Sequence, residues 1–170
     1  MNTLYLDMDG VLADFDGHAR TLFSKSVNPE TGMWDPEEWR KLSKVPNLYR
    51  HLPLMPQARE LYNLAMRFQN ELNWRVAVLT AVPKNNDVKD AFQDKFDWIA
   101  EHFPNTRIYF GPYSKDKQTH AKPGDILVDD RLSNCQEWTD AGGIAIRVTK
   151  QYDRAIEQLK QEFENRKAQL

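Results

Sequence analysis

Four aspartates stand in two short motifs at distant points of the chain. Asp7 and Asp9 belong to the run DMDGV, and Asp129 and Asp130 end the run ILVDD. If folding gathers these carboxylates, their charges repel strongly unless a cation or a proton holds them together. An oxygen-ligated divalent metal offsets this repulsion, and Mg²⁺ is the metal whose ligand preference best fits a set of carboxylates. The two motifs therefore predict a magnesium site.

The elements that must bring the motifs together follow from the hydrophobic pattern. Segments of helical length and period alternate with short apolar runs, an order typical of a parallel sheet with helices on both faces. We therefore predict an α/β fold, a Rossmann-like, doubly wound parallel sheet. The predicted strands are residues 3–6, 74–79, 107–110, 125–128 and 143–148, and the predicted helices are residues 57–71, 87–102, 131–141 and 151–169.

Three of these helices carry an apolar face at helical spacing, which predicts the side that packs on the sheet. The predicted inward faces are Ala58, Leu61, Leu64, Ala65, Phe68 and Leu72 on the first helix, Val88, Phe92, Phe96, Ile99 and Phe103 on the second, and Ala155, Ile156, Leu159 and Phe163 on the last. We expect Lys95 to be a surface lysine of the second helix.

Residues 15–56 interrupt the alternation of strands and helices. They contain no strand-like run, only two helical pieces, residues 15–26 and 35–43, separated by the turn-rich run NPETG. We interpret this segment as a small helical cap inserted after the first strand, with residues 1–14 and 57–170 forming the core domain. Trp34, Trp39 and Tyr49 make the segment more aromatic than a plain connection requires.

Ligands of open parallel sheets bind outside the carboxyl ends of the strands. Asp7 leaves the first predicted strand, Thr80 the second and Asp129 the fourth, so these side chains should meet on one rim. Lys117, shortly before the fourth strand, could balance a bound anion there. Taken alone, each motif also fits a plain role, such as an Asx turn, a helix N-cap or a solvated lysine. Their joint occurrence in this order favours a site.

The composition restricts the class of protein. The 170 residues suit one compact domain with a small insertion, and 23 basic against 25 acidic residues give a net charge of −2. This near balance argues against binding to long nucleic acids. No apolar run is long enough to span a membrane, and the start of the chain lacks the features of a secretion signal. With the lone Cys135, these features predict a cytoplasmic protein; a homodimer stays open.

The motifs resemble those of a known superfamily. The runs DMDGV, Leu79-Thr80 and ILVDD, together with Lys117, match the four motifs of the haloacid dehalogenase superfamily, whose commonest members are Mg²⁺-dependent phosphatases. The longer runs DMDGVLADF, TAVPK and DKFDW resemble more narrowly the 5′(3′)-deoxyribonucleotidases. The resemblance covers most of residues 7–131. It implies a phosphoric monoester hydrolase that acts on a small nucleotide substrate.

The resemblance also implies the chemical roles of the aspartates. Asp7 would attack phosphorus and form an aspartyl-phosphate, which water then hydrolyses. Asp9 would protonate the leaving alkoxide and afterwards deprotonate the attacking water. Mg²⁺ would be held by Asp7, the backbone carbonyl of Asp9 and Asp130, while Asp129 orients the outer coordination sphere.

Other residues would bind the phosphate. Thr80 and Lys117, with backbone N–H groups near Ala81, would hold the phosphoryl oxygens and stabilise the transition state. Ala81 stands where the family commonly has a phosphate-binding serine.

The substrate's nucleoside would contact the cap and the basic rim. Phe15 would stack on the nucleobase. Met33 and Trp34, in the run GMW, stand where the family has a Gly-aromatic-Trp sequence lining the pocket. Lys84 and Lys115 align with basic residues of the family's site, although an arginine is expected at the position of Lys115.

Two other functions fit part of the pattern. A phosphatase of another small metabolite, such as a sugar phosphate, would keep the chemistry and change the substrate. A receiver-type phosphoacceptor module also uses acids at strand ends, a threonine and a lysine around Mg²⁺. Such a module normally lacks an acid at the position of Asp9 and lacks an insertion like residues 15–56, so both features argue against it.

Overall fold

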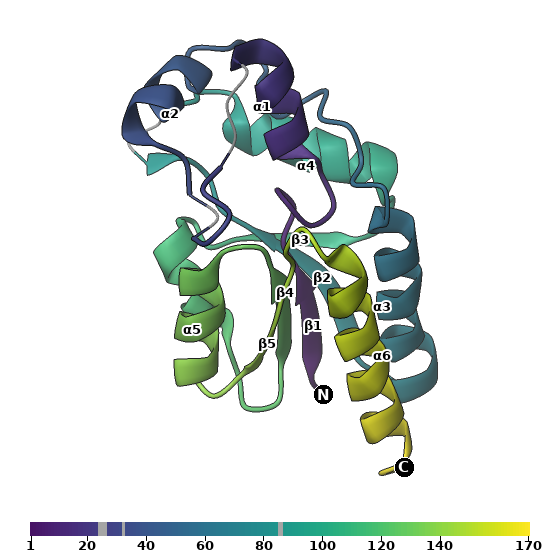
Figure 1. Ribbon diagram of the computed structural model, residues 1–170. Helices are drawn as coiled ribbons and strands as arrows, with labels where there is room; N and C mark the ends of the chain where they lie inside the picture. Colours follow the sequence, from purple (N-terminus) through teal and green to yellow (C-terminus); the bar gives the residue numbers. More distant parts are fainter. Residues whose placement is uncertain (24–26, 32, 85–86) are drawn as a thin grey trace.

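The computed structural model describes residues 1–23, 27–31, 33–84 and 87–170. Its centre is a five-stranded sheet with strand order β3-β2-β1-β4-β5 (Figure 1), and every neighbouring pair is parallel. The predicted α/β, Rossmann-like class is thereby confirmed. The strands are β1 (Thr3–Leu6), β2 (Arg75–Thr80), β3 (Arg107–Phe110), β4 (Ile126–Asp129) and β5 (Ile144–Arg147).

Helices cover both faces of this sheet. Helices α3 (Ala58–Leu72) and α6 (Tyr152–Lys167) pack together on one face, and α5 (Leu132–Asp140) lies on the other (Figure 1). The 3₁₀ helix η2 (Ser114–His120) contacts α5 and leads into β4. Alternate strand residues enter separate cores: Leu4 and Leu6 join the large cluster under α3 and α6, whereas Tyr5 packs with Trp138. This two-sided burial explains why the strands are apolar at successive positions.

The faces predicted for α3 and α6 are confirmed. All six apolar residues assigned to the first helix are buried, and so are the four assigned to the last. The pattern succeeds here because long amphipathic helices pack on the sheet through a single apolar stripe.

The predicted face of the second helix is partly wrong. Helix α4 (Ala91–His102) keeps Phe92 at 55% and Phe96 at 46% exposure, while Lys95 and Trp98 are buried. Phe92 lies at the sheet edge, where it stacks on Phe110 of the edge strand with ring centroids 4.3 Å apart. Apolar periodicity misplaced the face because it scored the buried lysine as a surface residue.

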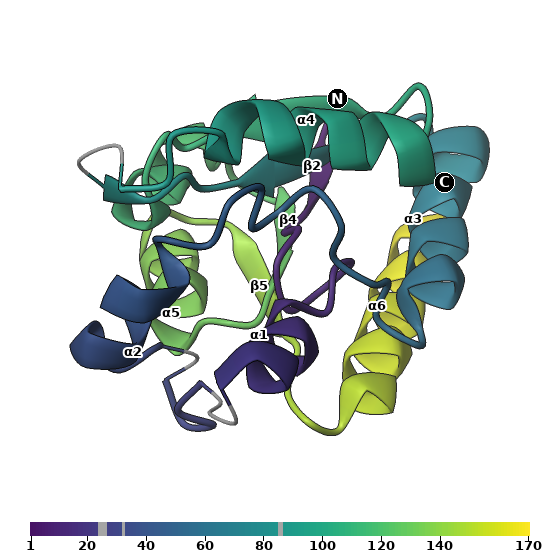
Figure 2. The same cartoon turned by 90° about the horizontal axis from the view of Figure 1, so that it is seen from above.

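The segment between β1 and α3 forms two short helices. Helices α1 (Phe15–Phe23) and α2 (Pro36–Leu42) lie above the carboxyl ends of the strands (Figures 1 and 2). The Asp35 carboxylate caps α2 by accepting a hydrogen bond of 2.8 Å from the Glu37 N–H. The last residues of the first predicted helix, 24–26, lie outside the described residues, as does Gly32 of the NPETG turn.

The chain returning from α2 is fastened to α4. The indole N–H of Trp98 donates to the Leu52 carbonyl at 2.8 Å, and the Arg50 guanidinium pairs with Glu101 at 2.7 Å. Helix α4 therefore supports both the sheet edge and the segment above it. Within the described residues, no helix combines the length and apolar composition needed to cross a bilayer.

The inward face of α4 can be tested by comparing two aromatic truncations. We expect Trp98→Ala to lower the free energy of unfolding by about 3–5 kcal/mol, because the fully buried indole leaves a cavity and an unpaired carbonyl. Phe96→Ala should cost less than about 1 kcal/mol, since that ring is half exposed. Urea denaturation followed by circular dichroism measures both values. Equal losses would contradict the observed face.

Candidate active site

The turn after β1 brings Asp7 to the end of the sheet. The Asp7 N–H donates to the Val128 carbonyl at 2.9 Å and extends the β1–β4 ladder by one residue. The chain then folds back, because the Met8 carbonyl accepts hydrogen bonds of 2.9 Å from both Leu12 N and Ala13 N. The Asp7 carboxylate is thus held at the strand ends by the backbone of its own loop.

Gly10 allows the two aspartate motifs to touch. Its φ of +77° lies in the left-handed region, and a Cβ there would collide with the carboxylate of Asp130. A glycine is therefore required twice, once by the backbone and once by the neighbouring acid. The DxDG run and the DD run form one surface.

Lys117 joins the carboxylates of both motifs. Its Nζ lies 2.8 Å from Asp7 Oδ1 and 2.7 Å from Asp129 Oδ2, and its side chain is 2% exposed. Burial alone would lower the pKa of Lys117, but the charges of Asp129 and Asp7 raise it above its ordinary value. The lysine is therefore a permanent cation, and the structure brings it to the aspartates as the sequence predicts.

Asp129 is fully buried and saturated with hydrogen bonds. Its Oδ1 accepts from Arg131 N at 2.9 Å and from Asn134 Nδ2 at 3.0 Å, while Oδ2 accepts from Lys117 and again from Asn134. Its oxygens are engaged by protein donors, so Asp129 orients Lys117. Asn134 was not among the residues predicted from the sequence; its one signal there is that it is a polar residue on the first turn of the helix after the DD run.

The carboxylates suit a divalent cation. Carboxylate oxygens of Asp7, Asp129 and Asp130 lie within 4.8 Å of one another, and Asp7 and Asp130 are the two acids of this group that line the pocket. Burial, opposed by Lys117, raises the pKa of Asp7 to about 7, and burial with the charges of Asp129 and Asp7 raises the pKa of Asp130 well above its usual range. A bound cation would restore the ionised forms. Among the described residues, the side-chain contacts of Asp7 fall on Oδ1, which leaves Oδ2 for a metal or for chemistry.

The expectation that Lys95 lies on the surface is wrong. Its side chain is 2% exposed; its ammonium forms an ion pair with Asp9 Oδ2 and donates to Thr80 Oγ1 at 3.1 Å. The same ammonium lies 4.3 Å from the centre of the Tyr49 ring. Lys95 is buried because a carboxylate, a hydroxyl and an aromatic face compensate for its lost hydration. The signal was available: Lys95 precedes the inward Trp98 by three residues, on the same side of a helix.

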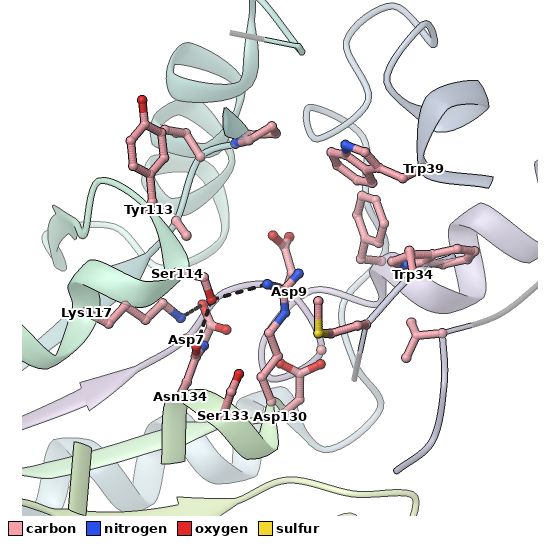
Figure 3. Close-up of a pocket in the computed structure, with 18 of the residues that line it drawn as sticks. Asp7, Asp9, Trp34, Trp39, Tyr113, Ser114, Lys117, Asp130, Ser133 and Asn134 are labelled. Atoms are coloured by element: carbon pink, nitrogen blue, oxygen red, sulfur yellow. Dashed lines mark hydrogen bonds and ion pairs between the residues drawn. The ribbon is translucent and has the colours of Figure 1, made fainter. Parts of the chain in front are cut away.

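A pocket of about 560 Å³ opens above the acids (Figure 3). Figure 3 shows Asp7, Asp9 and Asp130 facing the space that Lys117 and Ser114 border on one side and Trp34 and Trp39 border on the other. Thr80 and Asp129 have no exposed surface and lie behind the wall. The residues expected at the site that line the pocket are Asp7, Asp9, Phe15, Met33, Trp34, Ala81, Lys84, Lys115, Lys117 and Asp130.

Aromatic rings from the segment between β1 and α3 form one wall of this pocket. Phe15 stacks with Tyr49 at a centroid distance of 5.3 Å. The ring centroids of Trp34 and Trp39 lie 6.1 Å and 6.4 Å from that of Phe15. All four rings line the pocket, and Met33 beside them is 52% exposed. The cavity therefore combines a charged end, where Lys117 and a divalent cation held by the acids could bind an anion, with an aromatic wall, suited to a flat ring.

Comparison with known protein families decides the class of the protein. A family model described as 5′ nucleotidase, deoxy (pyrimidine), cytosolic type C protein matches residues 1–166. The chain belongs to this family. A search among curated proteins found no match.

Membership of the 5′-nucleotidase family makes the chain a phosphoric monoester hydrolase of the haloacid dehalogenase type. The predicted resemblance is confirmed, and the receiver-type module is excluded as the function. A divalent metal and a small nucleotide substrate follow from the family, and both suit the acidic cluster and the aromatic pocket.

Two glycines with similar backbones test the contact between the motifs. Gly10 and Gly142 have φ of +77° and +91°, but nothing lies within 4 Å of a Cβ added at Gly142. We expect both alanine variants to lose about 1–2 kcal/mol of stability through backbone strain. Gly10→Ala alone should also weaken Mn²⁺ or Mg²⁺ binding, at least about tenfold by titration calorimetry, because it displaces Asp130. Unchanged metal affinity in Gly10→Ala would contradict this contact.

Proposed function

We propose that the protein is a Mg²⁺-dependent phosphatase that hydrolyses nucleoside monophosphates, with 5′(3′)-deoxyribonucleotides as its preferred class, through an aspartyl-phosphate on Asp7. The observation that carries this proposal is the pocket itself. One end presents Asp7, Asp130 and Lys117, and the other is lined by the rings around Phe15. A phosphate and a base joined by a sugar match these two ends in chemistry.

Asp7 is assigned the nucleophilic role. Lys117 holds its Oδ1, so Oδ2 is the oxygen free to attack phosphorus. Asp7, the Asp9 carbonyl and Asp130 would hold Mg²⁺, with Asp129 orienting the outer sphere, and the ion would supply neutralising charge for a dianionic phosphate. Keeping Lys117 protonated adds a fixed cation beside the attacked group.

Asp9 is assigned the general acid and base roles. Lys95 fixes its Oδ2, while its Oδ1 is buried and has no hydrogen-bond partner among the described residues. That oxygen can carry a proton to the leaving alkoxide and later accept one from the attacking water. Thr80 supports this arrangement from behind, since its hydroxyl accepts a hydrogen bond from Lys95.

The phosphoryl oxygens would be bound by Lys117 and the backbone around Ala81, whereas Thr80, which the sequence also assigned to them, has no exposed surface and would act through Lys95. The alanine lines the pocket, whereas Thr80 lies in the wall beneath it. A serine at position 81 would add a hydroxyl donor that this chain lacks, so Lys117 carries a larger share of phosphate recognition here than in relatives that have the serine.

The nucleoside would be recognised by residues above the acids. Phe15, Met33 and Trp34 would contact the base; Lys84 and Lys115, exposed at the mouth of the pocket, would attract the anionic substrate. Trp39 and Tyr49 extend the aromatic wall and join this set. Residues 15–56 would thus act as the cap, and residues 1–14 and 57–170 as the core domain.

Two further properties follow from the proposed function. The cytosolic type in the family description favours a cytoplasmic enzyme. A sugar phosphate stays the second candidate substrate, because its phosphate would use the same acids; the four aromatic rings favour the nucleotide.

Substitution of the nucleophile tests the mechanism. We expect Asp7→Asn to lose phosphate release at least about 10⁴-fold, because an amide oxygen does not form the covalent intermediate. Asp153→Asn, on the outer side of α6, is the matched control and should retain full activity. The assay measures release of inorganic phosphate, with and without Mg²⁺. The substrates are deoxyribonucleoside and ribonucleoside 5′- and 3′-monophosphates and sugar phosphates, so the assay tests both the mechanism and the substrate class. Activity restricted to sugar phosphates, or retained by Asp7→Asn, would refute the proposal.

The role of Lys95 can be separated from substrate binding. Lys95→Met removes the charge that holds Asp9 but keeps the length of the side chain. We expect kcat to fall about 10- to 100-fold with KM nearly unchanged, because Asp9 would transfer a proton in the chemical step and would not contribute to substrate binding. Lys89→Met, at an exposed position just before α4, is the control. A rise in KM at constant kcat would show that Lys95 serves binding instead.

A further inference from the structure

Arg147 connects two loops that are distant in the sequence. It is the last residue of β5 and is paired in register with Asp129 of β4. Its Nε donates to the backbone carbonyl of Asp130 at 3.1 Å, and its Nη2 donates to the carbonyls of Glu30 at 2.5 Å and Pro29 at 3.5 Å. One half-buried guanidinium therefore spans the core and the segment above it.

The turn that Arg147 reaches is a folded unit. The Asn28 N–H donates to the Met33 carbonyl at 2.8 Å, and Asn28 Oδ1 accepts from Glu30 N at 2.8 Å and Thr31 N at 3.2 Å. Because the turn is closed in this way, fixing its outer carbonyls also fixes the chain that leaves it. That chain carries Met33 and Trp34, which line the pocket.

The other end of the bridge lies in the acidic motif. Arg147 binds the carbonyl of Asp130, whose carboxylate rests against Gly10 and faces the pocket. A guanidinium suits this task because its donors lie in one rigid plane and point in several directions at once. A lysine could satisfy one of these carbonyls but could not hold all three in fixed relation.

The remaining ties between the upper segment and the core lie elsewhere. Arg50 pairs with Glu101, Trp98 binds the Leu52 carbonyl, and Lys95 lies under Tyr49. These contacts hold the returning chain after α2. Among the described residues, the side-chain hydrogen bonds from the sheet to residues 28–31 come from Arg147.

We propose that Arg147 is a positioning residue that fixes the Met33–Trp34 wall relative to Asp130, so that a nucleoside on the wall is bound in register with its phosphate at the acids. The mechanical part of this inference, a tie between turn and core, stands on the contacts alone. Its consequence for substrate selection rests on the proposed function.

Hydrogen exchange tests the tie without any activity. In metal-free protein, we expect Arg147→Met to exchange the amide protons of Asn28, Glu30 and Thr31 about tenfold faster than the wild type, because the charge-assisted bonds that hold the turn are lost. Arg107→Met, at the exposed start of edge strand β3, is the matched control and should leave these rates unchanged. Unchanged rates in Arg147→Met would overturn the proposal.

Kinetics test the consequence for the substrate. For each variant, kcat/KM is measured for a deoxyribonucleoside 5′-monophosphate and for p-nitrophenyl phosphate, which has no nucleoside. We expect Arg147→Met to lower the ratio of the two values about tenfold, mainly through KM for the nucleotide, and Arg147→Lys to lower it less. An equal loss of kcat/KM on both substrates would show that Arg147 only helps to hold Asp130, and would refute the positioning role.

The two experiments also separate this inference from the proposed function. If the wild type fails to cleave nucleotides, the proposed function is wrong, while faster exchange in Arg147→Met still establishes the tie. If the wild type cleaves nucleotides and the ratio does not change, the function stands and the role of Arg147 in substrate selection is wrong.

Discussion

The structure depends on one electrostatic constraint, the gathering of aspartates at the end of a buried sheet. Asp7 and Asp129 are almost without solvent, and Lys117 lies within 2.8 Å of both. Removing one member of such a buried pair typically costs about 3–5 kcal/mol, because the remaining charge is left unpaired. The fold meets the constraint by placing β1 next to β4 and by bringing Lys117 of η2 to the acids that follow or end these strands. The same arrangement that offsets the cost of burying these charges leaves Asp7 Oδ2 and Asp130 facing the pocket.

A second buried lysine solves a related problem for Asp9 in another way. Lys95 lies on α4, the helix that follows β2, and its ammonium contacts a carboxylate, a hydroxyl and the ring of Tyr49. The two lysines thus hold the two acids of DMDGV from different elements. Under the proposed mechanism, this separation would let one acid be fixed for attack on phosphorus while the other is fixed for proton transfer, although only one residue lies between them.

Much of this arrangement could be predicted from the sequence, and the exceptions share a physical cause. The strands, the faces of α3 and α6, and the meeting of Asp7, Asp129 and Lys117 follow from periodicity and from the rule that ligands bind at strand ends. Lys95, Asn134 and Arg147 were missed because their burial or bridging depends on partners far along the chain. A polar residue looks like a surface residue until the group that satisfies it is known. Phe92 was misassigned for the complementary reason, since an aromatic ring can cover a sheet edge while half exposed.

Helix α4 has a consequence for the evolution and engineering of the segment above the acids. The returning chain is bonded to α4 through Leu52 and Arg50, and the same helix presents Lys95 to Asp9. The unit that could be exchanged between relatives is therefore discontinuous: residues 15–56 together with the matching face of a helix some forty residues later. A graft that ignored this helix would bring in a new aromatic wall and at the same time disturb Asp9, the residue proposed to transfer the proton. In this chain, α4 couples the position of the aromatic wall to the position of Asp9.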